Sequence, residues 1–303
     1  MRTTMSIRFS KMHGAGNDYV VMDARNQTQD WPEVAKKISD RHFGVGSDGI
    51  ILVAPSDVAD VRMRMFNPDG SEAEMCGNGI RCFTKYVVER RIVVKEGALK
   101  VETGAGILEV TPIVTSGKVA RARVSMGEPR FRAEDIPVAV PAGQKGFQLD
   151  PRQLDIRTVP TDTLVAGYPI TVDGRTFKIT CASMGNPHAV AFLDEPVDGV
   201  LLEIIGPKVE HLPLFPRRVN FHIVNIQGRD KLKARTWERG AGITLACGTG
   251  ACAIQAVARL LGLTDDMVQL AMPGGVLTIT WPGHGPVIME GPVEEVFEGE
   301  WRG

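Results

Sequence analysis

Two short stretches decide the fold: MCGNG at residues 75–79 and ACGTG at residues 246–250. Both contain Cys-Gly-x-Gly, and each comes just before an apolar segment that is typical of a helix, at residues 80–90 and 250–261. The same motif therefore occurs once in each half of the chain. A long-range similarity of this kind predicts two similar parts.

The segments around these motifs read mainly as short strands separated by turns. The chain has 33 Gly and 19 Pro, which mark the turns. A further helix is predicted at residues 31–40. The predicted strands are residues 19–22, 50–53, 61–66, 107–110 and 119–125 in the first half, and 177–181, 189–193, 221–226 and 233–237 in the second. This pattern predicts an α+β fold.

The length of the chain favours two domains rather than one core. Residues 128–146 are rich in Pro and Gly, although turns between strands would give the same composition. We place the boundary near residue 123. The predicted N-terminal domain is residues 1–122, with Cys76 and completed by the C-terminal strand 290–303, and the C-terminal domain is residues 123–289, with Cys247.

Composition excludes several classes of partner. The formal net charge is −1, so no excess of basic residues calls for nucleic acid or an anionic membrane. No signal-peptide run and no stretch of about 18 apolar residues occurs, which predicts a cytoplasmic protein. The chain has five cysteines, an odd number at low density, and none has companions at zinc spacing. We expect reduced thiols and no metal.

A cysteine just before a helix lies near unpaired N–H groups and the positive end of the helix dipole. That position favours the thiolate, and the adjacent glycines leave the same N–H groups open to a carboxylate. A single cysteine of this kind is more often inert and buried. Two copies favour function for Cys76 and Cys247, whereas Cys82, Cys181 and Cys252 read as core residues.

Two thiols facing one carbon would explain the duplication. Inverting a stereocentre without redox chemistry needs a base on one face and an acid on the other. One thiolate and one thiol supply both, and they exchange roles when the reaction reverses. The sequence therefore indicates a cofactor-independent epimerase.

The chain resembles diaminopimelate epimerases over essentially its full length. The matching blocks are KMHGAGNDY (11–19), DRHFGVG (40–46), FNPDGS (66–71), CGNGIRC (76–82), GNPH (185–188), ERGAG (238–242) and CGTG (247–250). The resemblance implies interconversion of LL- and meso-diaminopimelate without pyridoxal phosphate, for lysine and cell-wall precursor biosynthesis. It also implies a homodimer of two-domain subunits. In each domain a mostly antiparallel sheet would surround a central helix that starts after the catalytic cysteine.

The same resemblance assigns roles to individual residues. Cys76 and Cys247 would be the acid and base, and His188 and Glu238 would tune their pKa values, an imidazolium favouring a thiolate and a carboxylate disfavouring it. The substrate-binding residues would be Asn17, Asn67, Gly77, Asn78, Asn186, Asn220, Glu238, Arg239, Gly248 and Thr249. One departure is Gly49, since some family members have Gln at that position and its side-chain contact is absent here.

Other interpretations compete with this one. The segment 44–49 fits the dinucleotide pattern G-x-G-x-x-G, but a helix precedes it and a strand follows, the reverse of that fingerprint. Taken alone, His188 would more often be structural, and Asn67 fits a turn. A two-thiol racemase of proline, hydroxyproline or histidine type is the alternative enzyme. A binding protein that captures an amino acid is the third possibility, against which both cysteines argue.

Overall fold

The structure is a computed structural model that describes residues 6–149, 154 and 163–302. Its internal contacts divide the chain into two compact units, Met1–Ser125 with Glu290–Gly303, and Met126–Met289. The first unit thus takes in the C-terminal strand β18 (Glu294–Trp301), which pairs antiparallel with the N-terminal strand.

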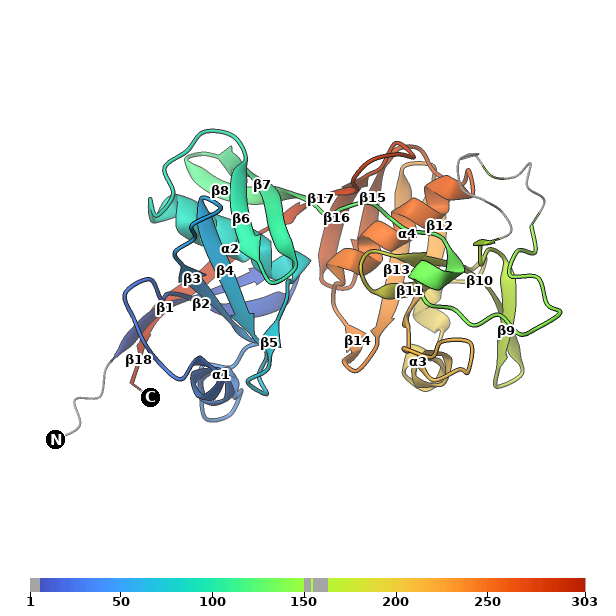
Figure 1. Cartoon of the computed structure of the whole chain (residues 1–303), viewed down its shortest axis with the longest axis horizontal. Helices are drawn as coiled ribbons and strands as arrows, with labels where there is room; N and C mark the ends of the chain where they lie inside the picture. Colours follow the sequence, from blue (N-terminus) through green and yellow to red (C-terminus); the bar gives the residue numbers. More distant parts are fainter. Residues whose placement is uncertain (1–5, 150–153, 155–162, 303) are drawn as a thin grey trace. The chain divides into compact units, whose positions relative to one another are not determined.

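The first unit consists of a sheet with two helices (Figure 1). Its elements in chain order are β1 (Ile7–Gly14), β2 (Asn17–Asp23), α1 (Trp31–Ser39), β3 (Ile50–Ala54), β4 (Val61–Phe66), β5 (Glu72–Ala73), α2 (Gly77–Glu89), β6 (Leu99–Thr103), β7 (Gly106–Thr115), β8 (Lys118–Ser125) and β18. The strand β17 (Ile288–Pro292) pairs with β8.

The second unit has a similar composition of elements. They are the short helix η1 (Ala133–Asp135), β9 (Tyr168–Val172), β10 (Arg175–Ser183), β11 (Pro187–Phe192), the short helix η4 (Val197–Gly199), α3 (Leu202–Glu210), β12 (Asn220–Gly228), β13 (Lys231–Glu238), β14 (Gly242–Thr244), α4 (Gly248–Leu260), β15 (Met267–Met272) and β16 (Gly275–Thr280).

The strands of the two units pair in the same order. In the first unit β1–β2 is antiparallel, β2–β3 parallel, β3–β4 and β4–β5 antiparallel, β4–β6 parallel and β6–β7 antiparallel. In the second, β10 to β16 repeat that succession. The prediction of an α+β fold with two similar, mostly antiparallel domains is confirmed.

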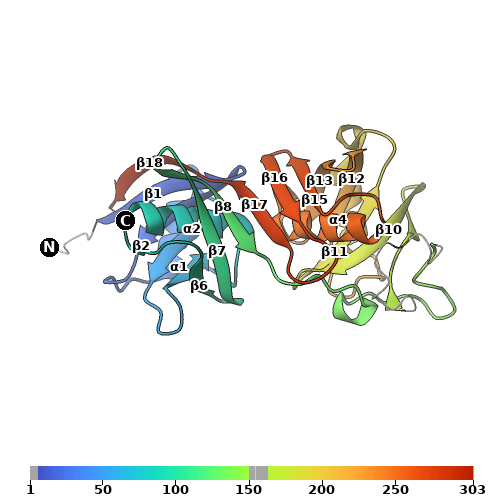
Figure 2. The same ribbon diagram turned by 90° about the horizontal axis from the view of Figure 1, so that it is seen from above.

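The helices that begin at the Cys-Gly-x-Gly motifs lie inside their units. Figures 1 and 2 show α2 and α4 each surrounded by strands of its own unit. All residues of α2 from Gly77 to Val87 are buried, as are nearly all of α4. The buried part of α2 includes the polar side chains of Asn78, Arg81, Thr84 and Lys85, and hydrogen bonds satisfy each of them. The helix starts are therefore held firmly.

The two outer helices, α1 and α3, cover the opposite faces of their sheets. In α1 the residues Trp31, Val34, Ala35 and Ile38 are buried, at the spacing of one helical face, and pack on a core that includes Phe66. The sequence predicted α1 but not α3, because α3 contains Gly206 and Pro207, which usually interrupt helices. Here a Cβ on residue 206 would lie 2.4 Å from Trp237 Cγ, so only glycine allows this packing.

Candidate active site

Cys76 and Cys247 each occupy the residue immediately before a buried helix. Both have extended backbone angles, φ −137° and ψ 124° for Cys76, and φ −117° and ψ 111° for Cys247. Neither side chain caps its own helix, so each sulfur is left for other partners. The first N–H groups of a helix have no acceptor within the helix, and here they belong to small residues. Both motifs thus provide a thiol and N–H donors at one point.

Tyr19, on β2, is the polar partner of Cys76. Its phenol oxygen lies 3.0 Å from Cys76 Sγ, and the tyrosine is 2% exposed. Burial and the neighbouring Cys76 raise the pKa of Tyr19 well above its ordinary value, so the phenol stays protonated. A phenol that keeps its proton can donate to a thiolate or accept from a thiol.

A hydrogen-bonded chain of amides lies beside the first motif. Asn78 Nδ2 donates to Asn17 Oδ1 at 3.0 Å, and Asn17 Nδ2 donates to Asp48 Oδ2 at 2.6 Å. Buried Arg81 donates to Asn78 Oδ1 at 2.9 Å and to the Gly77 carbonyl at 2.9 Å. The structure therefore brings Asn17, Gly77 and Asn78 together, with Arg81 fixing the orientation of the Asn78 amide.

The loop before β3 supplies the end of that chain. Asp48 accepts from Asn17 and from the Asp18 backbone N–H, and its other oxygen pairs with Arg41 at 2.7 Å. At the next residue, Gly49, φ is +149° and a Cβ would lie 2.4 Å from the Phe66 carbonyl oxygen. This backbone accepts only glycine without strain, and the polar contact of the loop comes from Asp48.

Asn67 sits in the turn after β4. Its Nδ2 donates to Ser71 Oγ at 3.0 Å, while its backbone N–H and carbonyl close the turn with Ser71 and Gly70. The turn chemistry seen in the sequence is thus present. No contact given by the structure joins Asn67 to Cys76.

Glu238, at the end of β13, is the partner of Cys247. The thiol donates to Glu238 Oε2 at 3.0 Å, and Thr244 donates its hydroxyl to Glu238 Oε1 at 2.6 Å. Cys247 is 4% exposed. Burial first, and then the charge and hydrogen bond of Glu238, raise the pKa of Cys247 well above its ordinary value, while Gly250 and Thr249 lower it by less. Cys247 is therefore a protonated thiol in this structure.

His188, on β11, is buried among neutral partners. Its Nε2 lies 2.8 Å from Asn186 Oδ1 and its Nδ1 lies 2.9 Å from His222 Nε2. Burial, His222 and Arg239 lower the pKa of His188 well below its ordinary value. The ring is neutral, which corrects the expectation of an imidazolium: a buried imidazole with neutral partners has nothing to stabilise its charge.

Asn186 links His188 to the second motif. Its Nδ2 donates to Thr249 Oγ1 at 3.3 Å, and Thr249 Oγ1 lies 3.7 Å from Cys247 Sγ. Among the expected residues of the second unit, the structure thus joins Cys247, Glu238, Thr249, Asn186 and His188 by direct contacts, with Gly248 as the first residue of α4.

Asn220 and Arg239 are not in that group of residues, and they contact each other. Asn220 Nδ2 donates to the Pro187 carbonyl at 3.1 Å, and Asn220 Oδ1 accepts from the Arg239 backbone N–H at 3.0 Å. Asn220 therefore links the start of β11 to the turn after β13. The guanidinium of Arg239 donates to the Arg217 carbonyl at 2.9 Å, and Arg239 is exposed, so most of its fork faces outward.

The chain matches the family model described as "Diaminopimelate epimerase" over residues 9–132 and 180–296. The chain belongs to this family. The diaminopimelate epimerase of Acetivibrio thermocellus is 48% identical, with 97% of this chain and 98% of that protein covered. The diaminopimelate epimerase of Methanococcus maripaludis is 45% identical, with 97% and 99% covered. The resemblance stated from the sequence motifs is confirmed.

Solved structures of other enzymes share the fold of this diaminopimelate epimerase family member. A PhzF-family phenazine biosynthesis protein of Bacillus anthracis has a TM-score of 0.64 at 19% identity, covering 98% of this chain and 99% of that chain. A hydroxyproline epimerase from Agrobacterium vitis has a TM-score of 0.63 at 14% identity, covering 99% and 93%. At such identities the likeness shows the fold alone.

The three remaining cysteines differ from Cys76 and Cys247. All five are free, and Cys82, Cys181 and Cys252 are completely buried. Burial raises the pKa of Cys82 to about 12 and raises the pKa of Cys181 further. These thiols are core residues, and within residues 6–149, 154 and 163–302 no group of three or more His, Cys, Asp or Glu could hold a metal ion.

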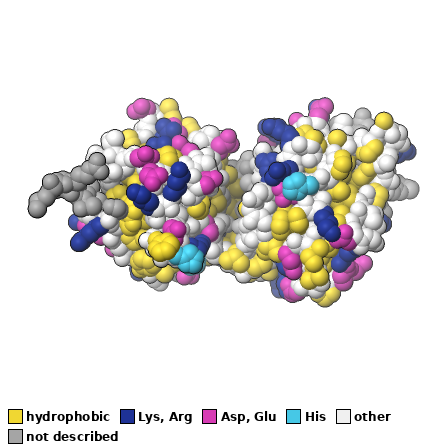
Figure 3. Space-filling model, turned by 90° about the horizontal axis from the view of Figure 1, so that it is seen from below, with side chains coloured by type: hydrophobic (Ala, Val, Ile, Leu, Met, Phe, Trp, Pro, Cys, Tyr) yellow, Lys and Arg dark blue, Asp and Glu magenta, His cyan; other side chains and the backbone are white. Residues whose placement is uncertain are grey.

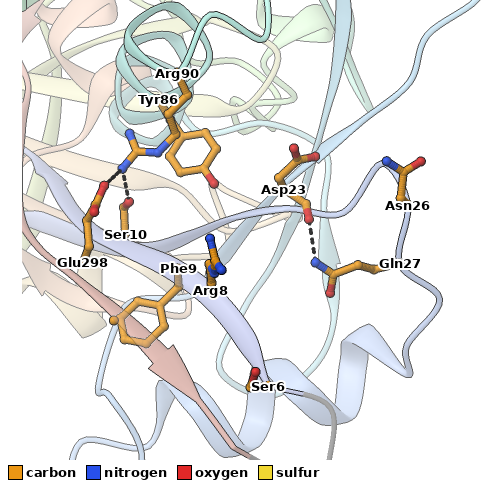
Figure 4. A pocket seen from close by; sticks show the side chains of 11 residues that line it. Ser6, Arg8, Phe9, Ser10, Asp23, Asn26, Gln27, Tyr86, Arg90 and Glu298 are labelled. Atoms are coloured by element: carbon orange, nitrogen blue, oxygen red, sulfur yellow. Dashed lines mark hydrogen bonds and ion pairs between the residues drawn. The ribbon is translucent and has the colours of Figure 1, made fainter.

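A separate cavity of about 550 Å³ lies in the first unit near β1 and β18 (Figure 4). Arg90 reaches across it to Ser10 and Glu298. None of the expected site residues lines it.

On the face drawn in Figure 3, basic and acidic side chains are interspersed. In the part of the chain that is described, no helix has the length and apolar character needed to cross a bilayer.

Several contacts of the site were not predicted from the sequence. Tyr19 ends the matching block KMHGAGNDY (11–19) but reads as a core strand residue, and Thr244, His222 and Thr236 belong to no recognised motif. Asp48 lies in the loop that departs from the family pattern. Only the strand pairing brings these residues to the helix starts.

Proposed function

We propose that this protein interconverts LL- and meso-diaminopimelate without a cofactor, using Cys76 and Cys247 as the acid and base. The observation that carries the proposal is the repeated helix start: one thiol in each unit, each immediately before a buried helix and each paired with a different polar group. Membership of the diaminopimelate epimerase family supports the substrate.

In the proposed reaction one thiolate removes the α-proton and the other thiol donates a proton to the opposite face of the same carbon. The bond from carbon to hydrogen breaks on one side, and a new one forms on the other, so no electron acceptor is needed. Because burial, and then Glu238, raise the pKa of Cys247, we assign the proton-donating thiol of the free enzyme to Cys247. Cys76, beside the phenol of Tyr19, is then the base.

The carboxylate next to the reacting carbon would bind the backbone N–H groups of Gly77-Asn78 and Gly248-Thr249. Donors already aimed at the carboxylate oxygens stabilise the negative charge that develops when the proton leaves. This arrangement requires both helix starts to reach one substrate. We therefore propose that the two units act as domains that close over it.

The distal amino-acid group of the substrate would be held by Arg239 and the asparagines. The exposed fork of Arg239 suits a carboxylate, and Asn amides both accept from ammonium and donate to carboxylate. In this proposal Asn17, Asn67 and Asn186 contact the substrate directly. Asn220, with its amide bound to two backbone groups, orients Arg239.

We further propose a homodimer, as the family resemblance implies, and a cytoplasmic protein that binds neither nucleic acid nor membranes, as its composition predicts. Light scattering coupled to size-exclusion chromatography would give the mass of the particle in solution. A mass of one chain at micromolar concentration would reject the dimer.

Incubation of the pure protein with LL-diaminopimelate in D2O tests the activity. We expect meso-diaminopimelate with deuterium at the inverted α-carbon. Cys76→Ala and Cys247→Ala should each abolish the reaction while keeping the circular dichroism spectrum, and Cys181→Ala should retain it. Wild-type protein that gives neither product nor deuterium would refute the proposed function.

A further inference from the structure

A continuous hydrogen-bond chain runs through the second unit behind Cys247. Thr236 Oγ1 lies 2.9 Å from His222 Nδ1, and His222 Nε2 lies 2.9 Å from His188 Nδ1. From there the chain passes through Asn186 and Thr249 to the Cys247 sulfur. Strand register creates its first half, because β12 and β13 pair His222 directly with Thr236.

The carboxylate of Glu238 sets the direction of this chain. A carboxylate only accepts, so the Cys247 thiol donates to it and the sulfur is left to accept from Thr249. Thr249 Oγ1 then accepts from Asn186 Nδ2, and Asn186 Oδ1 accepts from His188 Nε2–H.

The same logic continues into the buried histidine pair. With its proton on Nε2, His188 must accept at Nδ1 from His222 Nε2–H, and His222 Nδ1 must accept from the Thr236 hydroxyl. His188, His222 and Thr236 are each 0% exposed. Burial also lowers the pKa of His222 to about 3, so both rings are neutral and each has one donor and one acceptor nitrogen.

His222 is also packed directly against the start of α4. A Cβ on Gly250 would lie 2.5 Å from His222 Cε1 and 3.0 Å from Cys247 Sγ. Only glycine at this position lets the His222 ring pack against the start of α4. The His222 ring is packed against α4, and its Nδ1 and Nε2 contact Thr236 and His188, so its orientation is fixed.

We propose that His222 and Thr236 are positioning residues that hold His188 in its Nε2–H tautomer and thereby orient Asn186 and the Thr249 hydroxyl toward Cys247. In this proposal both residues act through His188. The inference rests on the proposed function for its catalytic meaning, whereas the tautomer itself is a property of the free protein.

Nuclear magnetic resonance of the full-length protein with 15N-labelled histidine tests the tautomer directly. We expect the His188 signals of a ring protonated on Nε2. His222→Gln retains an N–H donor near His188 Nδ1 and should keep this pattern, whereas His222→Leu removes the donor and should lose it. A wild-type His188 protonated on Nδ1 would overturn the proposal.

Kinetics test the consequence for the reaction. His222→Leu should lower kcat about tenfold, the effect that loss of one ordered hydrogen bond can have, and His222→Gln should restore most of it. Thr236→Val should also lower kcat, and Thr236→Ser, which keeps the hydroxyl, should restore most of it. His211→Gln, on an exposed histidine of the same unit, is the matched control.

These experiments separate the two proposals. Wild-type protein without epimerase activity would refute the proposed function but leave the tautomer measurement intact. If His222→Leu does not fold, the Thr236 pair and the wild-type spectrum still decide. Equal kcat in Thr236→Val and Thr236→Ser would contradict the positioning role of Thr236, and a His222→Leu variant with wild-type kcat would contradict that of His222.

Discussion

Glu238 Oε2 accepts a hydrogen bond from the Cys247 thiol at 3.0 Å, whereas the sulfur of Cys76 lies at the same distance from a neutral phenol. The two thiols therefore have unlike surroundings although the strands around them pair in the same order. A carboxylate favours the protonated thiol, and a phenol places no negative charge beside the sulfur. This difference suits a reaction that needs one acid and one base.

Glu238→Gln should lower the pKa of Cys247, because the amide removes the charge that disfavours the thiolate. We expect faster alkylation of Cys247 by iodoacetamide at pH 8, followed by mass spectrometry of its peptide, and a loss of epimerase activity of at least tenfold. Glu203→Gln, at a half-exposed position of α3, should change neither the alkylation rate of Cys247 nor the epimerase activity. An unchanged alkylation rate would show that Glu238 does not control this thiol.

Tyr19→Phe should reduce kcat while changing the fold little. The substitution keeps the ring in the core and removes the hydroxyl 3.0 Å from Cys76 Sγ. Loss of one hydrogen bond to the thiolate would lower kcat about tenfold, with a smaller effect on KM. Tyr168→Phe removes a hydroxyl from the second unit that bonds Gln144, and it serves as the control. Wild-type kcat in Tyr19→Phe would exclude a role for the phenol.

Gly250→Ala should destabilise the second unit. The new Cβ would lie 2.5 Å from His222 Cε1 and 3.0 Å from Cys247 Sγ, so a ring or the helix start must shift. We expect about 1–3 kcal/mol less free energy of unfolding by urea titration, the usual effect of overpacking. Gly199→Ala, where nothing lies within 4 Å of the added atom, should be neutral. Equal stability of the two variants would argue against tight packing of His222 on α4.

The buried His222 should make the protein less stable as pH falls below neutrality. Its pKa is about 3 when folded, against an ordinary value near 6.5, so the unfolded chain binds more protons between these limits. Stability from this group is complete above about pH 6.5 and is lost as pH falls toward 3. Between pH 7 and pH 5 the expected loss is about 2 kcal/mol.

Urea titrations at both pH values measure that loss. His222→Gln should show a smaller difference between pH 7 and pH 5 than the wild type, while His211→Gln should keep the full difference. Carboxylates such as Asp18 also have lowered pKa values, but they titrate below this window. The same difference in all three proteins would contradict the burial of a neutral His222.

The sequence predicted the helices α1, α2 and α4 and most of the longer strands. It predicted the last strand, β18, as the strand 290–303, but it missed the first strand β1, the strands β6, β9, β15 and β16, and the helix α3. The central helices were visible because long apolar segments follow the Cys-Gly-x-Gly motifs. Strand β18 lies at the end of the chain and owes its place to pairing with β1, a contact between residues far apart in sequence.

The sequence by itself determined the two thiols, the glycines beside them and the family, because local chemistry and motif order suffice for these. Only the tertiary structure decided which polar groups each sulfur meets. Tyr19 reaches Cys76 from another strand, Glu238 reaches Cys247 through the turn that follows β13, and His222 reaches His188 across a parallel pair. Strand register and burial set these contacts, and a linear pattern contains neither.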